Sequence, residues 1–226
     1  MNARDDDSAA LSRPPARLTR KGQATRARIV DAAARLMTET SVAGTRTDDV
    51  RAAAGVSASQ IYHYFEDKPA LVRAVIGHAT DLVLEAQQPV LGRLESMAAL
   101  RAWRDHVVEL QRAHDCEGGC PLGSLAGELA ETGGSARAQL AAGFARWEMA
   151  LRTGLTTMHE RGELRPGADP KELALALLSA LQGGILLSQL RRDTAPMRAA
   201  LDTVLDRIES LTTDRDARAD QAAAER

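Results

Sequence analysis

Apolar side chains recur at helical spacing along most of the 226-residue chain. In the segment 21–40 they fall at i, i+3, i+4, i+7 and i+8, the pattern of one helical face. These positions are Ile29, Ala32, Ala33, Leu36 and Met37. Alternating strand patterns are missing, and alanine, leucine and arginine dominate, which favours helix nearly throughout. The pattern therefore predicts an all-α protein.

Capping residues and breakers divide the rest of the chain into further helices. Thr47, Ser57 and Asp67 are suited to begin helices, and Gly55 is suited to the left-handed turn that ends one. Breakers such as E-G-G-C-P, T-G-G-S and R-P-G-A-D-P separate the later segments. After the first helix, helices are expected at 47–54, 57–64, 67–88, 96–115, 121–131, 135–162, 169–191 and 196–212.

The two short helices after residue 46 have the spacing of a helix-turn-helix unit. Helices of two turns are not stable alone and must pack against the first helix. The residues expected in that shared core are Val50, Ala53, Val56, Ile61 and Phe65. The outward positions of the second short helix carry small or polar groups, including Ser59, Gln60 and His63, which can hydrogen-bond to base edges and phosphates.

Charge is distributed unevenly, although the formal net charge is only −2. Between Arg13 and Arg35 the single acid is Asp31, and the basic residues are Arg13, Arg17, Arg20, Lys21, Arg26, Arg28 and Arg35. Such a local positive field is typical of a surface that faces phosphates. A solvated arm and a basic helix face without a partner are the alternative.

The stretch T-D-D-V-R-A-A-A-G-V-S-A-S-Q-I-Y-H-Y-F-E-D-K-P-A-L resembles the DNA-binding signature of the TetR family of bacterial transcriptional regulators. That signature runs T-x-x-[IV]-A-x-x-A-G-V-S-x-G-x-[LI]-Y-x-[YH]-F-x-x-K-x-x-L. The chain departs from it at Arg51, where alanine is usual, and at Ser59, where glycine is usual.

The resemblance implies a clamp on double-stranded operator DNA. By the family pattern, Thr47, Tyr64 and Lys68 anchor phosphates, and Phe65 packs into the core of the domain. The residues expected to contact DNA are Arg28, Thr47, Ser57, Ser59, Gln60, Tyr62, His63, Tyr64 and Lys68.

The helix expected at 169–191 is apolar on nearly every side, which implies a second burial surface besides its own subunit's core. With the helix after it, this segment resembles the two C-terminal helices that form the family's four-helix dimer interface. Gly183 and Gly184 would permit close helix approach. The expected interface residues are Leu177, Leu181, Ile185, Val204 and Ile208. Burial within one subunit is the alternative.

Two stripes of apolar and aromatic side chains follow the helices at 96–115 and 135–162. In the family this domain holds a cavity for a small organic effector, and such stripes could line it. The candidate ligand-binding residues are Trp103, Val107, Leu110, Cys120, Phe144, Trp147 and Leu151. Plain core packing is the alternative for each of them.

The segment H-D-C-E-G-G-C-P-L-G-S-L-A contains both cysteines of the chain. G-C-P-L-G-S-L resembles a motif that starts the sixth helix beside the cavity in some of these regulators. A redox pair of Cys116 and Cys120 is an alternative. So is a metal site of His114, Cys116 and Cys120, although this spacing is not a standard zinc pattern, and neither metal nor cofactor is expected.

The sequence thus predicts a dimeric, ligand-responsive repressor, with a cysteine-based redox or metal sensor and a helical enzyme or carrier as alternatives. An enzyme is not expected, since G-S-L-A-G matches a nucleophile elbow only loosely and no phosphate-binding loop is present. The expected division is a flexible tail at 1–18, a helix-turn-helix domain at 19–66, a ligand-binding and dimerisation domain at 67–213 and a flexible tail at 214–226. Without an N-terminal apolar run, a cytoplasmic location and no membrane partner are expected.

Overall fold

The computed structural model of the protein describes residues 18–131 and 134–213. Within these ranges the regular elements are helices, and one isolated antiparallel bridge joins Leu164 to Thr212. The elements are α1 Arg20–Thr40, α2 Thr47–Ala54, α3 Ala58–Tyr64, α4 Lys68–Glu85, the 3-10 helix η1 Val90–Arg93, α5 Met97–Ala113, α6 Pro121–Leu129, α7 Gly134–Glu160, α8 Pro170–Arg191 and α9 Ala195–Glu209. The all-α prediction is confirmed. The predicted tails fall outside the described residues, except Leu18.

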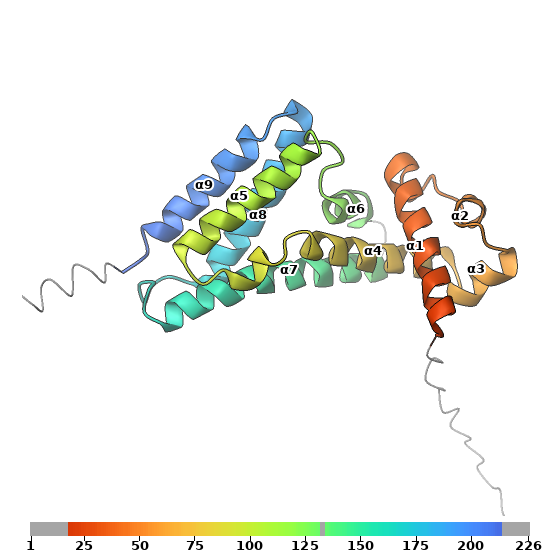
Figure 1. The fold of residues 1–226 in the computed structure, drawn as a ribbon, viewed down its shortest axis with the longest axis horizontal. Coiled ribbons are helices and arrows are strands. Elements are labelled where there is room, and N and C mark those ends of the chain that lie inside the picture. Colours follow the sequence, from red (N-terminus) through yellow and green to blue (C-terminus); the bar gives the residue numbers. More distant parts are fainter. Residues whose placement is uncertain (1–17, 132–133, 214–226) are drawn as a thin grey trace, which may run out of the picture.

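The first three helices form a small unit at one end of the molecule (Figure 1). Its core contains Ile29 and Ala33 of α1, Val50 of α2, Ile61 of α3 and Phe65, each at most 5% exposed. Burial against α1 stabilises the two short helices, which would not persist alone.

Two details of this unit differ from the sequence prediction. Ala53 is exposed, and the neighbouring Ala54 is buried in its place. The cap of α2 is Arg46 rather than Thr47, because the backbone N–H of Arg46 donates to the Asp49 carboxylate at 3.3 Å. Thr47 is thus the first residue of the helix, where its side chain is half-buried.

The other predicted helix signals are confirmed. The Ser57 hydroxyl accepts from the backbone N–H of Gln60 at 3.2 Å, and the Asp67 carboxylate accepts from that of Ala70 at 2.6 Å. Gly55 ends α2 in the left-handed region with φ of 62°, a conformation that costs glycine little. These signals fix where α3 and α4 begin.

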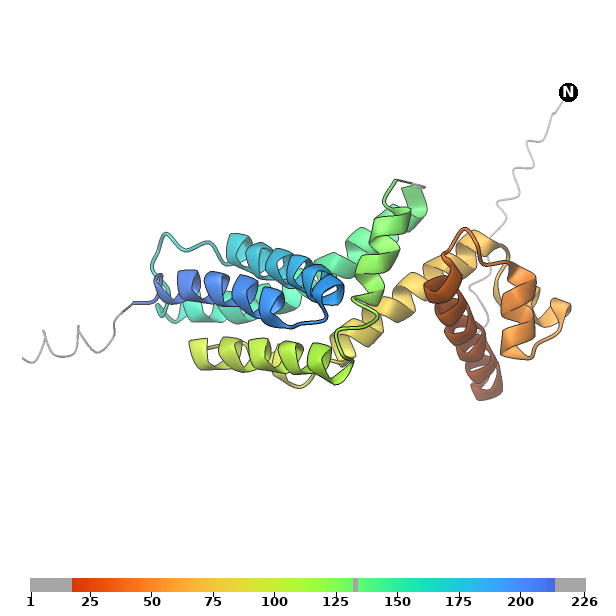
Figure 2. The same cartoon turned by 90° about the horizontal axis from the view of Figure 1, so that it is seen from above.

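Helix α4 runs from the N-terminal unit into the larger helical body (Figure 2). It packs against α1 at one end and against α6 and α7 further along. It ends at Glu85, shorter than predicted, and the chain then turns through η1. Helix α4 thus connects the N-terminal unit to the larger body.

Helices α5, α7, α8 and α9 form the larger body, and α6 crosses beside α4 (Figures 1 and 2). Gly184 of α8 lies so close to α9 that an added Cβ would stand 2.6 Å from the Met197 Cα. Gly184 therefore permits a close approach of α8 and α9 within one subunit, whereas the glycine pair was expected to permit it at the dimer interface. Gly183 faces open space.

Candidate DNA-binding and ligand sites

Helix α3 presents its polar side chains to solvent and its apolar side chain to the core. Ile61 is buried, whereas Ser59, Gln60 and His63 are exposed, and the Tyr62 ring is 62% exposed. Helix α3 lies at the end of the molecule, beside α1 and α2 (Figure 1). This is the arrangement that a helix needs in order to enter a DNA groove.

A network of cap hydrogen bonds holds the start of α3. The Gln60 side-chain oxygen accepts from the backbone N–H of Ser57 at 2.9 Å, and the Ser57 hydroxyl lies 3.0 Å from that of Ser59. The Gln60 oxygen is thus already engaged, which leaves its amide nitrogen as the group that could reach a base. Three of the predicted contact residues therefore also order one another.

Two of the predicted phosphate anchors, Tyr64 and Lys68, lie at or just after the other end of α3, and the third, Thr47, begins α2. Tyr64 is half-buried, and its ring meets that of His63 edge to face with centroids 5.0 Å apart. Lys68, half-buried at the start of α4, donates from Nζ to the Ala43 carbonyl at 3.4 Å. Arg28 is exposed on α1. Apart from Lys68 at the start of α4, the predicted residues lie in this unit, and all but the half-buried Thr47, Tyr64 and Lys68 are exposed.

Arg26 belongs to the same surface and escaped the sequence analysis as a site residue. Its guanidinium lies over the Phe65 ring, 5.1 Å from the centroid, which is within the range of a cation–π contact. Phe65 thus anchors a basic side chain besides filling the core. Only the three-dimensional fold brings these two residues together.

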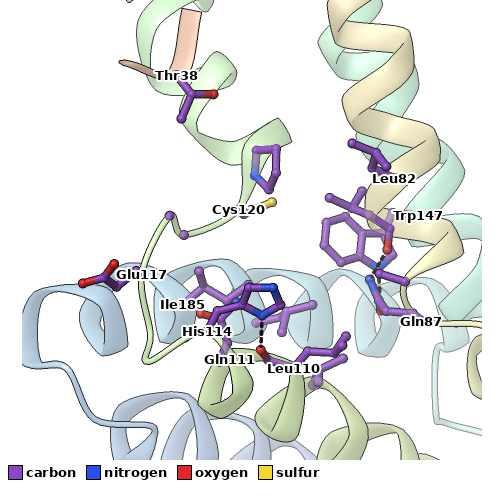
Figure 3. Close-up of a pocket in the computed structure, with 17 residues that line it drawn as sticks. Thr38, Leu82, Gln87, Leu110, Gln111, His114, Glu117, Cys120, Trp147 and Ile185 are labelled. Carbon is purple, nitrogen blue, oxygen red and sulfur yellow. Dashed lines mark hydrogen bonds between the residues drawn. The ribbon is translucent and has the colours of Figure 1, made fainter. Parts of the chain in front are cut away.

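A cavity of about 420 Å³ lies in the larger body, between α4, α5, α7, α8 and the loop that precedes α6 (Figure 3). Four of the predicted ligand-binding residues line it, namely Val107, Leu110, Cys120 and Trp147. The other three do not.

The three misplaced residues fill the space between helices. Trp103 and Leu151 are fully buried, and Phe144 stacks on Trp147 with ring centroids 6.4 Å apart. Helical spacing shows which side chains face inward, but it cannot distinguish a close-packed neighbour from a cavity wall. Trp103 and Leu151 thus lie in the core, Phe144 packs against it, and none of the three lines this cavity.

Residues that the sequence analysis missed complete the cavity. One of them is Gln87, which follows the end of α4. Its side-chain oxygen accepts from the indole N–H groups of Trp103 at 2.9 Å and Trp147 at 3.2 Å. Its side-chain nitrogen donates to the Val83 carbonyl at 2.7 Å. Thr38 reaches the cavity from α1, so the N-terminal unit contributes to its wall.

Both cysteines are buried and unpaired. Cys120 caps α6, and its Sγ accepts from the Gly123 N–H at 3.3 Å and from the Gln182 side chain at 3.6 Å. Burial raises the pKa of the Cys120 thiol above its ordinary value, and these hydrogen bonds oppose the shift only in part. The protonated thiol is a poor nucleophile, which disfavours the redox alternative.

The metal alternative has no geometric support. In the described parts of the chain, no three His, Cys, Asp or Glu side chains converge as metal ligands would. His114 instead donates from Nδ1 to the Leu110 carbonyl at 2.8 Å, because a carbonyl can only accept.

One carboxylate connects the larger body to the N-terminal unit. Glu128 on α6 accepts from the backbone N–H groups of Val42 and Ala43, each at 3.0 Å, through its two different oxygens. Val42 and Ala43 lie in the turn between α1 and α2. Charge-assisted bonds to two adjacent amides fix both position and orientation of that turn. We call this contact the Glu128 bridge.

The outer face of α8 carries a stripe of exposed leucines. Leu175, Leu186, Leu187 and Leu190 are between 46% and 74% exposed. The predicted interface residues of α8 lie on the opposite face, where the subunit's own helices bury them; these are Leu177, Leu181 and Ile185. That part of the prediction is wrong, and Leu181 and Ile185 line the cavity instead.

On α9, Ile208 is likewise buried in its own subunit, and Val204 is half-buried. The two faces of α8 explain why the helix is apolar nearly all round. Its length and composition would also suit a membrane span, a property that core helices of soluble proteins share.

A three-helix unit with an exposed polar recognition helix, joined to a helical body, defines a helix-turn-helix DNA-binding protein. Residues 29–75 match the family described as bacterial regulatory proteins, tetR family, and residues 96–204 match the tetracyclin repressor-like C-terminal domain. The chain belongs to the TetR family of bacterial transcriptional regulators. Members of this family are DNA-binding proteins without enzymatic activity.

Similar proteins agree with this assignment. The HTH-type transcriptional repressor DhaR of Mycobacterium sp. (strain GP1) is 24% identical over 81% of this chain and 91% of its own. The crystal structure of a TetR transcriptional regulator from Chloroflexus aurantiacus J-10-FL shares 30% identity and a TM-score of 0.71, covering 86% of this chain and 98% of that one. The regulatory protein TetR from Rhodobacter sphaeroides has the same fold, with 24% identity over 80% and 97% of the two chains and a TM-score of 0.68.

Proposed function

We propose that this regulator is a homodimeric cytoplasmic repressor that leaves its operator when a small organic molecule fills the cavity. One observation carries the proposal. The loop from Glu117 to Pro121 forms a wall of the cavity and leads directly into α6, whose Glu128 holds the turn between α1 and α2. The cavity and the DNA-binding unit are thus joined by one short helix.

On DNA, the recognition helices of the two subunits enter successive major grooves, about 34–36 Å apart. Lys68, Tyr64 and Thr47 contact phosphates and set the register, and Arg28 adds positive charge to the same surface. Ser59, Gln60 and His63 reach base edges and supply sequence preference.

The exposed leucine stripe of α8 forms the centre of the dimer interface. Four large apolar side chains on one helix face are costly to leave in water, and a symmetric dimer buries them against their own copies. Dimerisation fixes the distance between the two recognition helices, so it is a condition for tight operator binding.

Release follows from two conformations of the subunit. A ligand shifts the equilibrium between them only if it binds one conformation more tightly than the other. Each tenfold difference in affinity shifts the free energy by roughly 1.4 kcal/mol. Occupation of the cavity displaces the loop before α6, and α6 then moves the α1–α2 turn through the Glu128 bridge. The recognition helices take a spacing that no longer fits two successive grooves.

The test uses cavity-filling substitutions, because they need no known effector. In Leu110→Trp the larger ring occupies the cavity, and binding to labelled DNA from the region upstream of the protein's own gene should weaken about tenfold. Ala86→Trp fills the cavity from α4 and serves as an independent second variant. Ala102→Trp places the same ring on the exposed side of α5 and should bind DNA normally.

Two results would count against the proposal. One is that the protein shows no preference for that DNA over unrelated DNA. The other is that both cavity variants, shown by circular dichroism to be folded, bind as tightly as the Ala102→Trp control.

A further inference from the structure

The side chains of the cavity wall determine what kind of molecule the cavity can hold. An inference about that molecule rests on the proposed function in one respect, because it takes the cavity as the effector site. The end of the cavity at Trp147, which we call the deep end, is apolar. Val83, Val107, Leu181 and Trp147 belong to the wall and are all buried. A ligand must therefore bury an apolar body at this end.

Polar groups at the deep end are already satisfied within the protein. Gln87 uses its oxygen for two indole N–H groups and its nitrogen for a backbone carbonyl. The Cys120 sulfur accepts two hydrogen bonds, and burial keeps its thiol protonated by raising the pKa. These atoms stabilise the wall. Because their hydrogen bonds are already made within the protein, they cannot stabilise a charged group of a ligand at this end.

The opposite end of the cavity is polar and more open. His114 and Glu117 are exposed there, and Gln111 is half-buried beside them. Figure 3 shows His114 and Glu117 on the side of the cavity away from Trp147. The His114 Nδ1 is engaged with the Leu110 carbonyl, so Nε2 is the ring atom that remains for a ligand.

No lysine or arginine belongs to the wall as far as the described residues form it, and its one carboxylate is Glu117. Glu117 lies 3.6 Å from Arg192, so that pair is nearly neutral and sits at the rim. A buried anion without a cationic partner is strongly disfavoured. A carboxylate, a phosphate or a thioester of a phosphorylated carrier would find no counter-charge.

We infer that the effector is an uncharged, mainly apolar molecule with an apolar ring or chain against Trp147 and one neutral polar head group near His114. Alcohols, ketones and amides of moderate size belong to this class. Organic acids and their phosphorylated carriers do not.

A matched pair of probes tests the inference. 1-Naphthalenemethanol and 1-naphthoate share the same ring system and differ in the charge of the head group. In calorimetric titrations of the full-length protein, the alcohol should bind at least about tenfold more tightly than the acid, because only the acid must bury a charge.

A charge substitution sharpens the comparison. Gln111→Arg places a cation at the polar end and should reduce or invert the preference for the alcohol, whereas Gln111→Leu, which adds no charge, should retain it. Leu110→Trp should abolish binding of the alcohol, since the added ring occupies its place.

The outcomes separate this inference from the proposed function. Equal or tighter binding of 1-naphthoate to the unmodified protein, binding of neither probe, or alcohol binding that survives Leu110→Trp would each overturn the inference. Operator release by 1-naphthoate would do so while supporting the proposed function. Alcohol binding in the cavity without any change in operator affinity would support the inference and refute the proposed ligand response.

Discussion

The two binding regions of the molecule are built in opposite ways. The DNA-binding face is an exposed polar surface on short helices, ordered by caps such as the bonds between Ser57 and Gln60. The cavity proposed for the effector lies between long helices, has one apolar and one polar end, and is ordered by side-chain packing around Trp147 and Gln87. Substitutions in the first region should therefore change contacts with DNA and leave the fold intact, whereas substitutions in the second should change packing.

The same contrast separates the two faces of α8. Its inner face, with Leu181, is part of the subunit's core and of the cavity wall, and its outer face, with Leu186 and Leu190, is in solvent in the single subunit. A charge on the inner face would disrupt the fold. A charge on the outer face would disrupt only what packs upon it.

The largest effect is expected from Leu186→Glu. Two glutamates would be buried at the interface of a symmetric dimer, and burying such unpaired charges costs several kcal/mol. The dimer should dissociate, and operator affinity should fall by about a hundredfold or more, as expected for that loss of free energy. Sedimentation and circular dichroism would show a folded monomer.

Met149→Glu is the matched control for this variant, since Met149 is 55% exposed on α7 and does not line the cavity. It should remain dimeric. Leu181→Glu should instead lower helicity, because that residue is 1% exposed within the subunit. A dimeric Leu186→Glu protein with normal operator affinity would refute the interface.

The next largest effect is expected from the phosphate anchors. Lys68→Ala should weaken binding to all DNA sequences alike and lower the slope of log K against log salt concentration by about 1, because one phosphate contact is lost. Tyr64→Phe should weaken binding in the same sequence-independent way. Salt titrations on operator and unrelated DNA measure both. Unchanged affinity in both variants would contradict the clamp.

Smaller effects on affinity are expected from substitutions of the α3 residues that are proposed to contact bases. Gln60→Ala should change the preferred operator sequence and also remove a cap bond, which costs about 1 kcal/mol of stability. Ser59→Ala removes a neighbouring hydroxyl and leaves the bonds between Ser57 and Gln60 in place, so it separates the two effects. If binding-site selection returned the same operator from both variants, the assignment of base contacts would be wrong.

The smallest effect concerns the pH dependence of stability. The pKa of Cys120 is raised in the folded protein above its ordinary value of 9.0. The folded protein therefore holds the thiol proton more tightly than the unfolded chain does. The contribution of this thiol to the free energy of unfolding is fully present below pH 9.0 and is lost as the pH rises through the pKa of Cys120 in the folded protein. Denaturant titrations between pH 8 and 10.5 should therefore show a steeper decline in the unmodified protein than in Cys120→Ala.

Cys116→Ala leaves Cys120 in place and should retain the steeper decline. Identical pH profiles for Cys120→Ala and the unmodified protein would show that the buried thiol does not contribute.

Sequence reasoning succeeded where the determinants are local. The caps at Ser57 and Asp67, the turn at Gly55 and the recognition helix all depend on residues within a few positions of one another, so the motif from Thr47 to Lys68 specifies them. The misassigned cap of α2 is a shift of one residue, because the Asp49 carboxylate bonds to the N–H of Arg46 and places the helix start there.

It failed where the determinants come from distant segments. The cavity wall extends in sequence from Thr38 to Ile185, and helical periodicity does not reveal which inward residues leave a space between them. The choice between the two apolar faces of α8 depends on how α7 and α9 pack upon it. The two hydrogen bonds of the Glu128 bridge join residues that are 85 and 86 positions apart in the sequence, so no local sequence pattern predicts them.

In the proposed response, cavity occupation reaches the DNA-binding unit through the Glu128 bridge. A double-mutant cycle on operator affinity tests this coupling, with Leu110→Trp as the cavity change and Glu128→Gln as the bridge change. Leu110→Trp should weaken operator binding about tenfold in the unmodified protein but less than about threefold in Glu128→Gln, because the bridge no longer transmits the shift. Strictly additive effects of the two substitutions, with both proteins folded and dimeric, would contradict it.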